Sequence, residues 1–174
     1  MADVAVAPLH LPGMITLKGD LGDPRLAMAV RGATGQGVPG RLAATFGPDG
    51  RGVRWLAPDE VLLIADGGGK AVASIAQAMA GAPHLVADVS DARVAYRVAG
   101  PGARAVLARL SPADLAAPGF GPGSVRRTRL AQVPCAAWMT SDTGIDLLVS
   151  RSVAGYARAA LEGAVASEVV TSVA

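Results

Sequence analysis

The sequence is short of the side chains that carry most enzyme chemistry. Its 174 residues include one cysteine and two histidines, and aromatic residues make up only 3%. His10, His84 and Cys135 lie far apart and form no metal-ligand motif, and neither histidine has the surroundings of a nucleophile–base pair. We therefore expect no metal site and no catalytic constellation in this chain.

Other absences bear on location. A lone Cys135 excludes an internal disulfide framework and fits a reducing compartment, so we expect a cytoplasmic protein. The N-terminus has no basic region before an apolar one, so no signal peptide is expected. No apolar run approaches the roughly 18 residues that cross a bilayer, so we expect no association with a membrane.

Strong charge of either sign is also missing. Sixteen basic residues stand against fourteen acidic ones, which leaves a net charge of +2. Because there is no dense basic tract and aromatic residues for base stacking are scarce, nucleic acid is not an expected partner. Arg126, Arg127 and Arg129 form one small basic cluster, which fits either a solvated strand edge or a partner surface.

Apolar residues are abundant, at 51%, together with 22 glycines and 12 prolines. A chain of this size and composition buries a core, built here mainly from Ala, Val and Leu. The glycine clusters lack the spacing of nucleotide-binding loops. In Asp66-Gly-Gly-Gly-Lys70 the next residue is Ala71 rather than Ser or Thr, so we interpret this run as a turn that leads into a helix over 71–81.

Acidic side chains occur close together in two places. Asp59-Glu60 follows Pro58 and precedes an apolar run, but adjacent residues on a strand point to opposite faces, so the two make a poor catalytic pair. Asp88 and Asp91 flank Val89-Ser90 and are typical of turns and helix caps.

A weak internal repeat is the clearest organising feature. Residues 15–18 alternate between apolar and polar and end at Gly19, and residues 94–98 do the same before Gly100, at an offset of 81. Two further matches have similar offsets: Leu62 with Leu147, and Trp55 with Trp138. Three matches in register favour a true repeat over chance.

The repeat predicts an α+β fold of two pseudo-symmetric, ferredoxin-like β-α-β-β-β-α halves, with helices on one side of antiparallel sheet. We expect an N-terminal tail over 1–12, a first half over 13–83 and a second half over 84–168, which together form one compact domain. In the second half we expect a helix after Pro101 and a short helix capped by Ser111 and Asp114. Strands over 124–131, 134–140 and 145–149 and a final helix over 153–165 complete it.

Five stretches form an ordered set of motifs that spans most of the chain. They are Trp55-Leu-Ala-Pro-Asp-Glu-Val-Leu-Leu63, Asp88-Val-Ser-Asp91 with Gly100-Pro-Gly-Ala103, Leu107 to Leu115, Phe120-Gly-Pro-Gly123 with Thr128, and Leu147-Leu-Val-Ser-Arg-Ser152 with Tyr156 and Leu161. This set resembles the gamma-subunit family of heterotetrameric sarcosine oxidase, whose pattern includes WLGPDEWLL and VDVSD…GPGA. The resemblance runs from about Gly13 to Val165.

The resemblance implies a fold related to the folate-binding domain of the glycine-cleavage aminomethyltransferases. It also implies a non-catalytic subunit that assembles with alpha, beta and delta subunits. The whole complex oxidatively demethylates sarcosine to glycine, forms hydrogen peroxide and passes a one-carbon unit to tetrahydrofolate. FAD, FMN, NAD, zinc and tetrahydrofolate are then expected in the other subunits and not in this chain.

On this interpretation the functional residues lie in an interface or a structural motif. The candidates come from the motifs and the basic cluster: Trp55, Pro58, Asp59, Glu60, Asp88, Ser90, Asp91, Arg126, Arg127, Arg129, Arg151 and Ser152. The family often has tryptophan at the positions of Val61 and Leu161, so we expect Trp55, Trp138 and Tyr156 to be the aromatic anchors. We also expect an exposed apolar patch larger than that of an ordinary monomer.

An alternative interpretation is a stand-alone folate-binding or aminomethyltransferase-like module. Such a module needs a carboxylate that holds the pterin, in a pocket between the halves. Glu60, Asp88 and Asp91 are the candidate carboxylates, and binding of tetrahydrofolate distinguishes this interpretation from the first.

Overall fold

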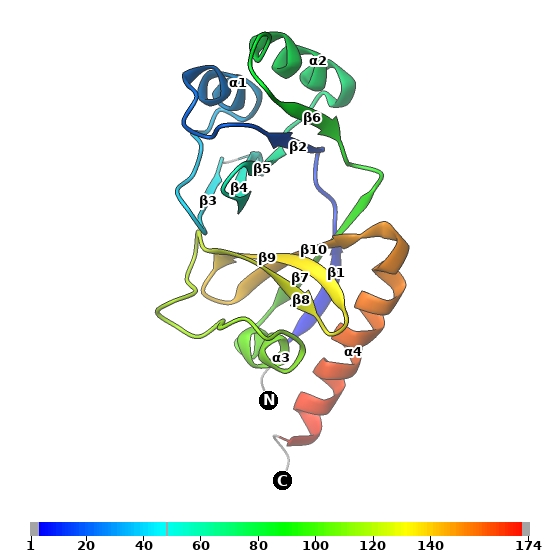
Figure 1. Cartoon of the computed structure of the whole chain (residues 1–174). Coiled ribbons are helices and arrows are strands. Elements are labelled where there is room, and N and C mark those ends of the chain that lie inside the picture. The colour runs from blue at the N-terminus through cyan, green and yellow to red at the C-terminus, as the bar shows by residue number, and fades with distance from the viewer. Residues whose placement is uncertain (1–3, 48, 172–174) are drawn as a thin grey trace. The chain divides into compact units, whose positions relative to one another are not determined.

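The chain forms two compact units, each built on a five-stranded antiparallel sheet (Figure 1). The structure is a computed structural model that describes residues 4–47 and 49–171, with side chains as far as residue 167. Leu11–Asp91 forms one unit, called here the central unit. The segment up to His10 joins the chain from Ala92 onward to form the other, called the terminal unit.

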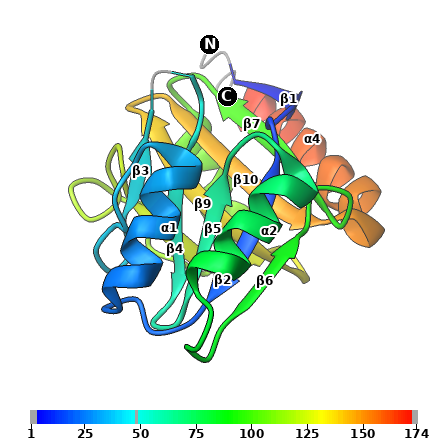
Figure 2. The ribbon, with the colours of Figure 1, turned by 90° about the horizontal axis from the view of Figure 1, so that it is seen from above.

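In the central unit two helices cover one face of a sheet with the order β3-β4-β5-β2-β6 (Figure 2). The elements, in chain order, are β2 (Met14–Lys18), α1 (Pro24–Thr34), β3 (Ala44–Phe46), β4 (Gly52–Ala57), β5 (Glu60–Ile64), α2 (Gly68–Ala78) and β6 (Leu85–Asp88). The start of α1 follows from its sequence, since the Asp23 side chain accepts a hydrogen bond from the Arg25 amide and Pro24 opens the first turn. Gly35, with a φ of 72°, ends the helix.

The terminal unit repeats this plan, and its sheet has the order β1-β7-β10-β9-β8. Its elements are β1 (Ala5–Leu9), β7 (Arg93–Ala99), α3 (Ala103–Leu110), β8 (Val125–Leu130), β9 (Val133–Ser141), β10 (Gly144–Ser150), the single 3-10 turn η1 (Arg151–Val153) and α4 (Ala154–Thr171). The predicted α+β fold and its two β-α-β-β-β-α halves are therefore confirmed.

Each unit has its own apolar core between its sheet and its helices. In the central unit Ile15, Leu17, Val61 and Leu63 of the sheet pack with Leu26, Val30, Ile75 and Met79. In the terminal unit Tyr96, Val98, Ile145 and Leu147 pack with Leu107, Ala157 and Leu161. Alternate residues of each strand therefore face the helices, as the period of two requires.

Equivalent hydrogen bonds show how the two halves correspond. The amide of Gly19 donates to the carbonyl of Asp59 at 3.0 Å, and the amide of Gly100 donates to the carbonyl of Thr143 at 2.9 Å. In both units the glycine that follows the strand before the first helix (β2 or β7) is thus tied to the turn before the neighbouring strand (β5 or β10). The sequence match between Gly19 and Gly100 is confirmed.

The tryptophan match is wrong by one residue. Register pairs Arg54 with Leu62, whereas it pairs Trp138 with Asp146. Thr16 and Arg97 hold the same position in the two units, and they pair with Leu62 and Asp146, respectively, so Leu62 corresponds to Asp146. Trp138, the partner of Asp146 on the next strand, therefore corresponds to Arg54 and not to Trp55. A shift of one residue moves a side chain to the opposite sheet face, which similarity of letters does not reveal.

The match of Leu62 with Leu147 is wrong for the same reason. Leu147 belongs to the core beneath the helices, and Leu63 is the residue with that position in the central unit.

The expected N-terminal tail is wrong in part, because residues 5–9 form strand β1 at the edge of the terminal sheet. Ala5 pairs with Ala99 and Leu9 with Ala95. The central unit's own edge strand, β6, holds the equivalent place beside β2. The structure consequently divides the chain after His10 and after Asp91, rather than at residue 83, and it gives two compact units rather than one.

One expected helix is also absent from the described part of the chain. Residues 111–124 form turns and loops and no helix. Ser111 and Asp114 do accept hydrogen bonds from the amides of Ala113 and Ala116, so they cap turns. A segment with Pro112 and Pro118 has too few free amides to continue a helix there.

Candidate functional site

The first candidate stretch, Trp55 to Glu60, forms the hairpin between β4 and β5. Pro58 and Asp59 are its two exposed turn residues, and Ala57 pairs with Glu60. The carbonyl of Asp59 is the acceptor for Gly19 described above. The role visible for this motif is therefore to join the turn to the end of β2.

Glu60 is buried, with 7% of its surface exposed. One carboxylate oxygen lies 3.5 Å from the Lys18 ammonium and the other accepts from the Thr16 hydroxyl at 3.4 Å. The partners come from β2, directly beside β5. A buried carboxylate with two partners on the neighbouring strand is committed to holding that strand pair together.

The second stretch, Asp88 to Asp91, closes the central unit at the other end of β2. Ser90 donates from its amide and its hydroxyl to one Asp88 carboxylate oxygen, at 2.9 and 2.6 Å. These hydrogen bonds lower the pKa of Asp88 below its ordinary value. The Ser90 hydroxyl oxygen in turn accepts from the Met14 amide at 3.0 Å, so the motif ties the end of the unit to its first strand.

The basic cluster lies on β8, the edge strand of the terminal sheet. Arg127 and Arg129 are exposed, and Arg126 is half-buried with its guanidinium 5.4 Å from the centre of the Phe120 ring. Arginines on an edge strand discourage pairing with a further strand. The cluster therefore lies on an exposed sheet edge, which fits both a solvated edge and a partner surface.

The fourth stretch, Arg151-Ser152, begins η1 just before α4. Both side chains are exposed. The amide of Arg151 donates to the carbonyl of Ala92 at 2.9 Å, and its guanidinium donates to the carbonyl of Arg93 at 3.3 Å. This motif fixes where α4 leaves the sheet.

Within each unit, the structure does not gather these stretches into one site. Glu60 pairs with β2 at Lys18, whereas Asp88 pairs with the opposite end of β2 at Ile15. In the terminal unit β9 separates the β8 arginines from β10, whose end carries Arg151. Within each unit the candidate residues thus lie at separate places.

A polar cluster that the sequence reasoning missed lies on the helix-free face of the terminal sheet. Arg97 donates to both carboxylate oxygens of Asp146, at 2.7 and 2.9 Å, and the Trp138 indole N–H donates to the same carboxylate at 3.1 Å. Asp146 is 2% exposed. The ion pair raises the pKa of Arg97 above its usual value. The sequence did contain a signal for this cluster, since Asp146 lies inside the apolar run Ile145–Val149 and a buried carboxylate needs a partner.

Groups of three or more metal-ligating side chains are absent from residues 4–47 and 49–171. Cys135 is buried, and burial raises the pKa of its thiol to about 12. The thiol is therefore protonated at neutral pH and is a poor nucleophile. Among the helices that the structure describes, none has the length and apolar character needed to cross a membrane.

The aromatic anchors fall into three environments. Trp138 is fully buried, Trp55 is half-buried, and Tyr156 on α4 is 46% exposed. The large apolar residues that are exposed within the described chain are Met28, Phe46, Leu85 and Tyr156. Three of these four, Met28, Phe46 and Leu85, lie in the central unit.

Comparisons with known proteins identify relatives over most of the chain. A family model described as "Sarcosine oxidase, gamma subunit family" matches residues 18–167. A sarcosine oxidase subunit gamma from Arthrobacter sp is 34% identical over 131 residues, which are 75% of this chain and 63% of that protein. The matched region thus spans less than two thirds of the length of this curated relative.

Solved structures agree on the fold. A chain of the heterotetrameric sarcosine oxidase from Corynebacterium sp. U-96, in complex with pyrrole 2-carboxylate, superposes with a TM-score of 0.84 at 28% identity, over 94% of this chain and 84% of that chain. The glycine cleavage system aminomethyltransferase T from Bartonella henselae gives a TM-score of 0.61 at 17% identity, over 93% of this chain and 46% of that chain. The latter likeness is one of fold alone. With the family match over residues 18–167, these findings place the chain in the sarcosine oxidase gamma subunit family.

Proposed function

We propose that this chain is a non-catalytic subunit of a heterotetrameric sarcosine oxidase and that it serves the assembly of that complex with alpha, beta and delta subunits. The complex oxidatively demethylates sarcosine to glycine, forms hydrogen peroxide and passes a one-carbon unit to tetrahydrofolate. The single observation that carries the proposal is the family match over residues 18–167. The likeness of almost the whole chain to one chain of a solved heterotetrameric sarcosine oxidase supports it.

The chemistry of the described residues supports a structural role. Glu60, Asp88 and Asp146, which are typical of catalytic acids by residue type, are each engaged by neighbouring side chains of the same unit. In this proposal FAD, FMN, NAD, zinc and tetrahydrofolate belong to the other subunits. The single cysteine supports a cytoplasmic location for the complex.

Folate binding by this chain remains the second candidate function. The aminomethyltransferase likeness favours it only at the level of fold. Neither the α1–α2 cavity nor the cavity beside α3 includes Glu60, Asp88 or Asp91 among its lining residues. Calorimetric titration with tetrahydrofolate tests it, and we expect no heat of binding at high micromolar ligand.

Co-purification tests the assembly role. The chain, carrying an affinity tag, is co-expressed with alpha, beta and delta subunits of a sarcosine oxidase from the same organism. We expect a stoichiometric complex with a flavin absorption spectrum and sarcosine-dependent formation of hydrogen peroxide. A chain that stays monomeric and retains none of the three subunits, while they are soluble, contradicts the proposal.

A further inference from the structure

The two units differ in their charge. Residues 1–10 and 92–174, which form the terminal unit, include nine arginines and six acidic residues, a net charge of +3. Residues 11–91, which form the central unit, include seven basic and eight acidic residues, a net charge of −1. The positive charge of this chain is therefore concentrated in the terminal unit, where three of the nine arginines lie on strand β8.

Two of these β8 arginines have only neutral partners within the part of the chain that the structure describes. The Arg126 guanidinium donates to the carbonyls of Gly119 and Val125. The Arg129 guanidinium donates to the carbonyl and to the side-chain oxygen of Gln132, at 3.1 and 3.3 Å. A neutral acceptor orients a guanidinium without cancelling its charge, so both groups can still form a stronger, charged pair with a carboxylate.

The acidic residues of the terminal unit do not offset these two charges. The structure describes four of them, which are Asp114, Asp142, Asp146 and Glu162. Asp146 and Glu162 form ion pairs with Arg97 and Arg158. Asp114 and Asp142 form no ion pair with any residue that the structure describes. A carboxylate for Arg126 and Arg129 has to come from another molecule.

The edge of β8 also offers main-chain groups. Leu130 and Val133 face each other across a two-residue turn, so their main-chain groups bond to each other. Because these groups alternate along an antiparallel strand, the amide and the carbonyl of Arg129 point away from β9. β8 is the last strand of its sheet, so this side of Arg129 is the open edge. Such an edge is complementary to an added strand.

The spacing of the two arginines also favours a strand as the partner. Arg126 and Arg129 are about 10 Å apart along β8 at the rise of a strand, and their odd spacing places them on opposite faces of the sheet. Arg126 lies against Phe120, which belongs to the core beneath the helices. A helix that lies on one face reaches one arginine, whereas an extended segment along the edge points alternate side chains to both faces. Acidic residues three apart in that segment then meet both arginines.

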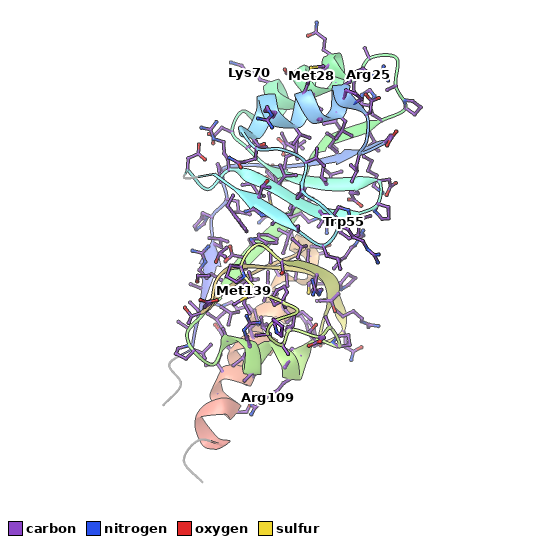
Figure 3. The ribbon with its side chains drawn as sticks, turned by 90° about the vertical axis from the view of Figure 1, so that its left-hand side faces the viewer. Arg25, Met28, Trp55, Lys70, Arg109 and Met139 are labelled. Atoms are coloured by element: carbon purple, nitrogen blue, oxygen red, sulfur yellow. The ribbon has the colours of Figure 1, made fainter. Side chains whose placement is uncertain are left out.

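The last turn of α3 lies beside the same edge. The amide of Ala131, in the turn after β8, donates to the carbonyl of Leu110 at 2.6 Å. The exposed Arg109 directly precedes Leu110 on this helix (Figure 3). Arginine is enriched in protein interfaces, so the side chains that border the edge suit a protein partner.

We propose that the β8 edge is the docking site for an extended acidic segment of another subunit, which adds to the terminal sheet as a strand and places carboxylates beside Arg126 and Arg129. The inference rests on the proposed function, since that function supplies the partner. The arginines oppose pairing with neutral or basic strands, so they also select the acidic one. A second copy of this chain fits less well, because two-fold pairing of β8 edges brings arginine against arginine.

Reversal of one charge tests the electrostatic part. Arg129→Glu is compared with Arg41→Glu, which makes the same change of charge at an exposed site of the central unit. We measure binding of the full chain to the remaining subunits, after thermal unfolding shows that both variants keep the wild-type midpoint. We expect Arg129→Glu to bind about tenfold more weakly and Arg41→Glu to bind within about twofold of wild type, with a smaller difference at high salt. Equal affinities for wild type and Arg129→Glu overturn the proposal.

Hydrogen exchange tests the added strand without any substitution. The Arg129 amide of the wild-type chain is followed by mass spectrometry, alone and in the assembled complex. We expect its exchange to slow by at least about tenfold in the complex, because a main-chain hydrogen bond to the new strand protects it. Exchange at the same rate in both states overturns strand addition, even if the charge reversal weakens binding.

A photo-crosslinking residue in place of Gln132, which is exposed in the turn beside the edge, identifies the occupant. We expect a crosslink to a segment of another subunit with acidic residues three apart. A crosslink to a second copy of this chain, or to a segment without acidic residues, overturns the inference while co-purification still supports the assembly role. If wild type binds no subunit at all, the proposed function fails first.

Discussion

The central and terminal units share one topology but use their helix-free sheet faces differently. In the terminal unit this face is centred on a saturated polar cluster, in which Asp146 is held by Arg97 and Trp138. In the central unit the positions equivalent to these by register carry Thr16, Leu62 and Arg54. The comparison teaches that the strand ladders and the glycine ties define the fold, whereas the chemistry of this face is free to differ.

The two tryptophans provide the strongest test of this comparison. Trp138 is fully buried, so Trp138→Ala should lower the free energy of unfolding by about 3–5 kcal/mol. Trp55→Ala should cost less, on the order of 1–2 kcal/mol, because Trp55 is only half-buried. Urea unfolding followed by circular dichroism measures both. Equal losses would contradict the assignment of the two residues to different environments.

Trp138→Phe separates the two contributions of that side chain. It keeps an aromatic ring and removes the indole N–H that donates to Asp146. Since Arg97 still holds the carboxylate, we expect the lost hydrogen bond to lower the free energy of unfolding by about 1 kcal/mol. The smaller volume of the phenyl ring should add a smaller loss.

The paired glycines provide the second test. Gly100 has a φ of 128°, a conformation in which a residue with a side chain is strained, whereas the φ of Gly19 is not positive. We expect Gly100→Ala to cost about 1–3 kcal/mol. Gly19→Ala should cost less than about 1 kcal/mol, because the nearest atom to its Cβ would be the end of the Leu26 side chain, at 3.3 Å, and the Pro83 carbonyl oxygen and the His84 Cβ lie at ordinary contact distances of 3.5 and 3.8 Å. A larger loss at Gly19, measured by thermal unfolding, would break the comparison.

Cys135 reports on the terminal unit alone. Burial raises its pKa to about 12, so the folded thiol should react slowly with a disulfide reagent at pH 8, and the chain unfolded in guanidinium should react at once. In the unfolded chain the thiol ionises at about pH 8.5. The contribution of Cys135 to the stability of the folded chain is therefore fully present below that pH and is lost as the pH rises toward 12. Rapid reaction of the folded chain would show that β9 opens readily.

The smallest expected effect concerns the closure of the central unit. Ser90 hydrogen bonds lower the pKa of Asp88, so Ser90→Ala should raise that pKa, and Ser90→Thr should leave it nearly unchanged. The Asp88 contribution to stability is present above the unfolded pKa of about 3.9 and disappears as pH falls through the lower folded value. Titration of the Asp88 carboxyl by NMR measures this. An unchanged pKa in Ser90→Ala would assign the shift to another group.

Much of the fold was predictable because the alternation of apolar and polar residues and the glycines that end the strands agree with each other. Residues 15–18 and 94–98 alternate and end in glycines, and the structure confirms both strands and their equivalence. Strand β1 was missed because Ala5–Leu9 has no strong alternation and its partner β7 is distant in sequence. Its place in the sheet depends on tertiary pairing, which local pattern does not encode.

The candidate site was predictable as a set of motifs but not as a set of contacts. The Trp55–Glu60 and Asp88–Asp91 stretches were found by resemblance, and the structure explains them as a hairpin tie and a unit closure. The Arg97–Asp146 pair was not found, because two residues on different strands become neighbours only through register.

The position of β1 has a consequence for synthesis of the chain. Ala5 pairs with Ala99, so this strand leaves the ribosome before the whole central unit and before its own partner. At typical translation rates the interval is on the order of ten seconds, which is ample for the intervening unit to fold. Throughout that interval β1 is an unpaired strand, and Pro8 within it discourages improper pairing. The terminal unit is thus completed last, around a strand that was made first.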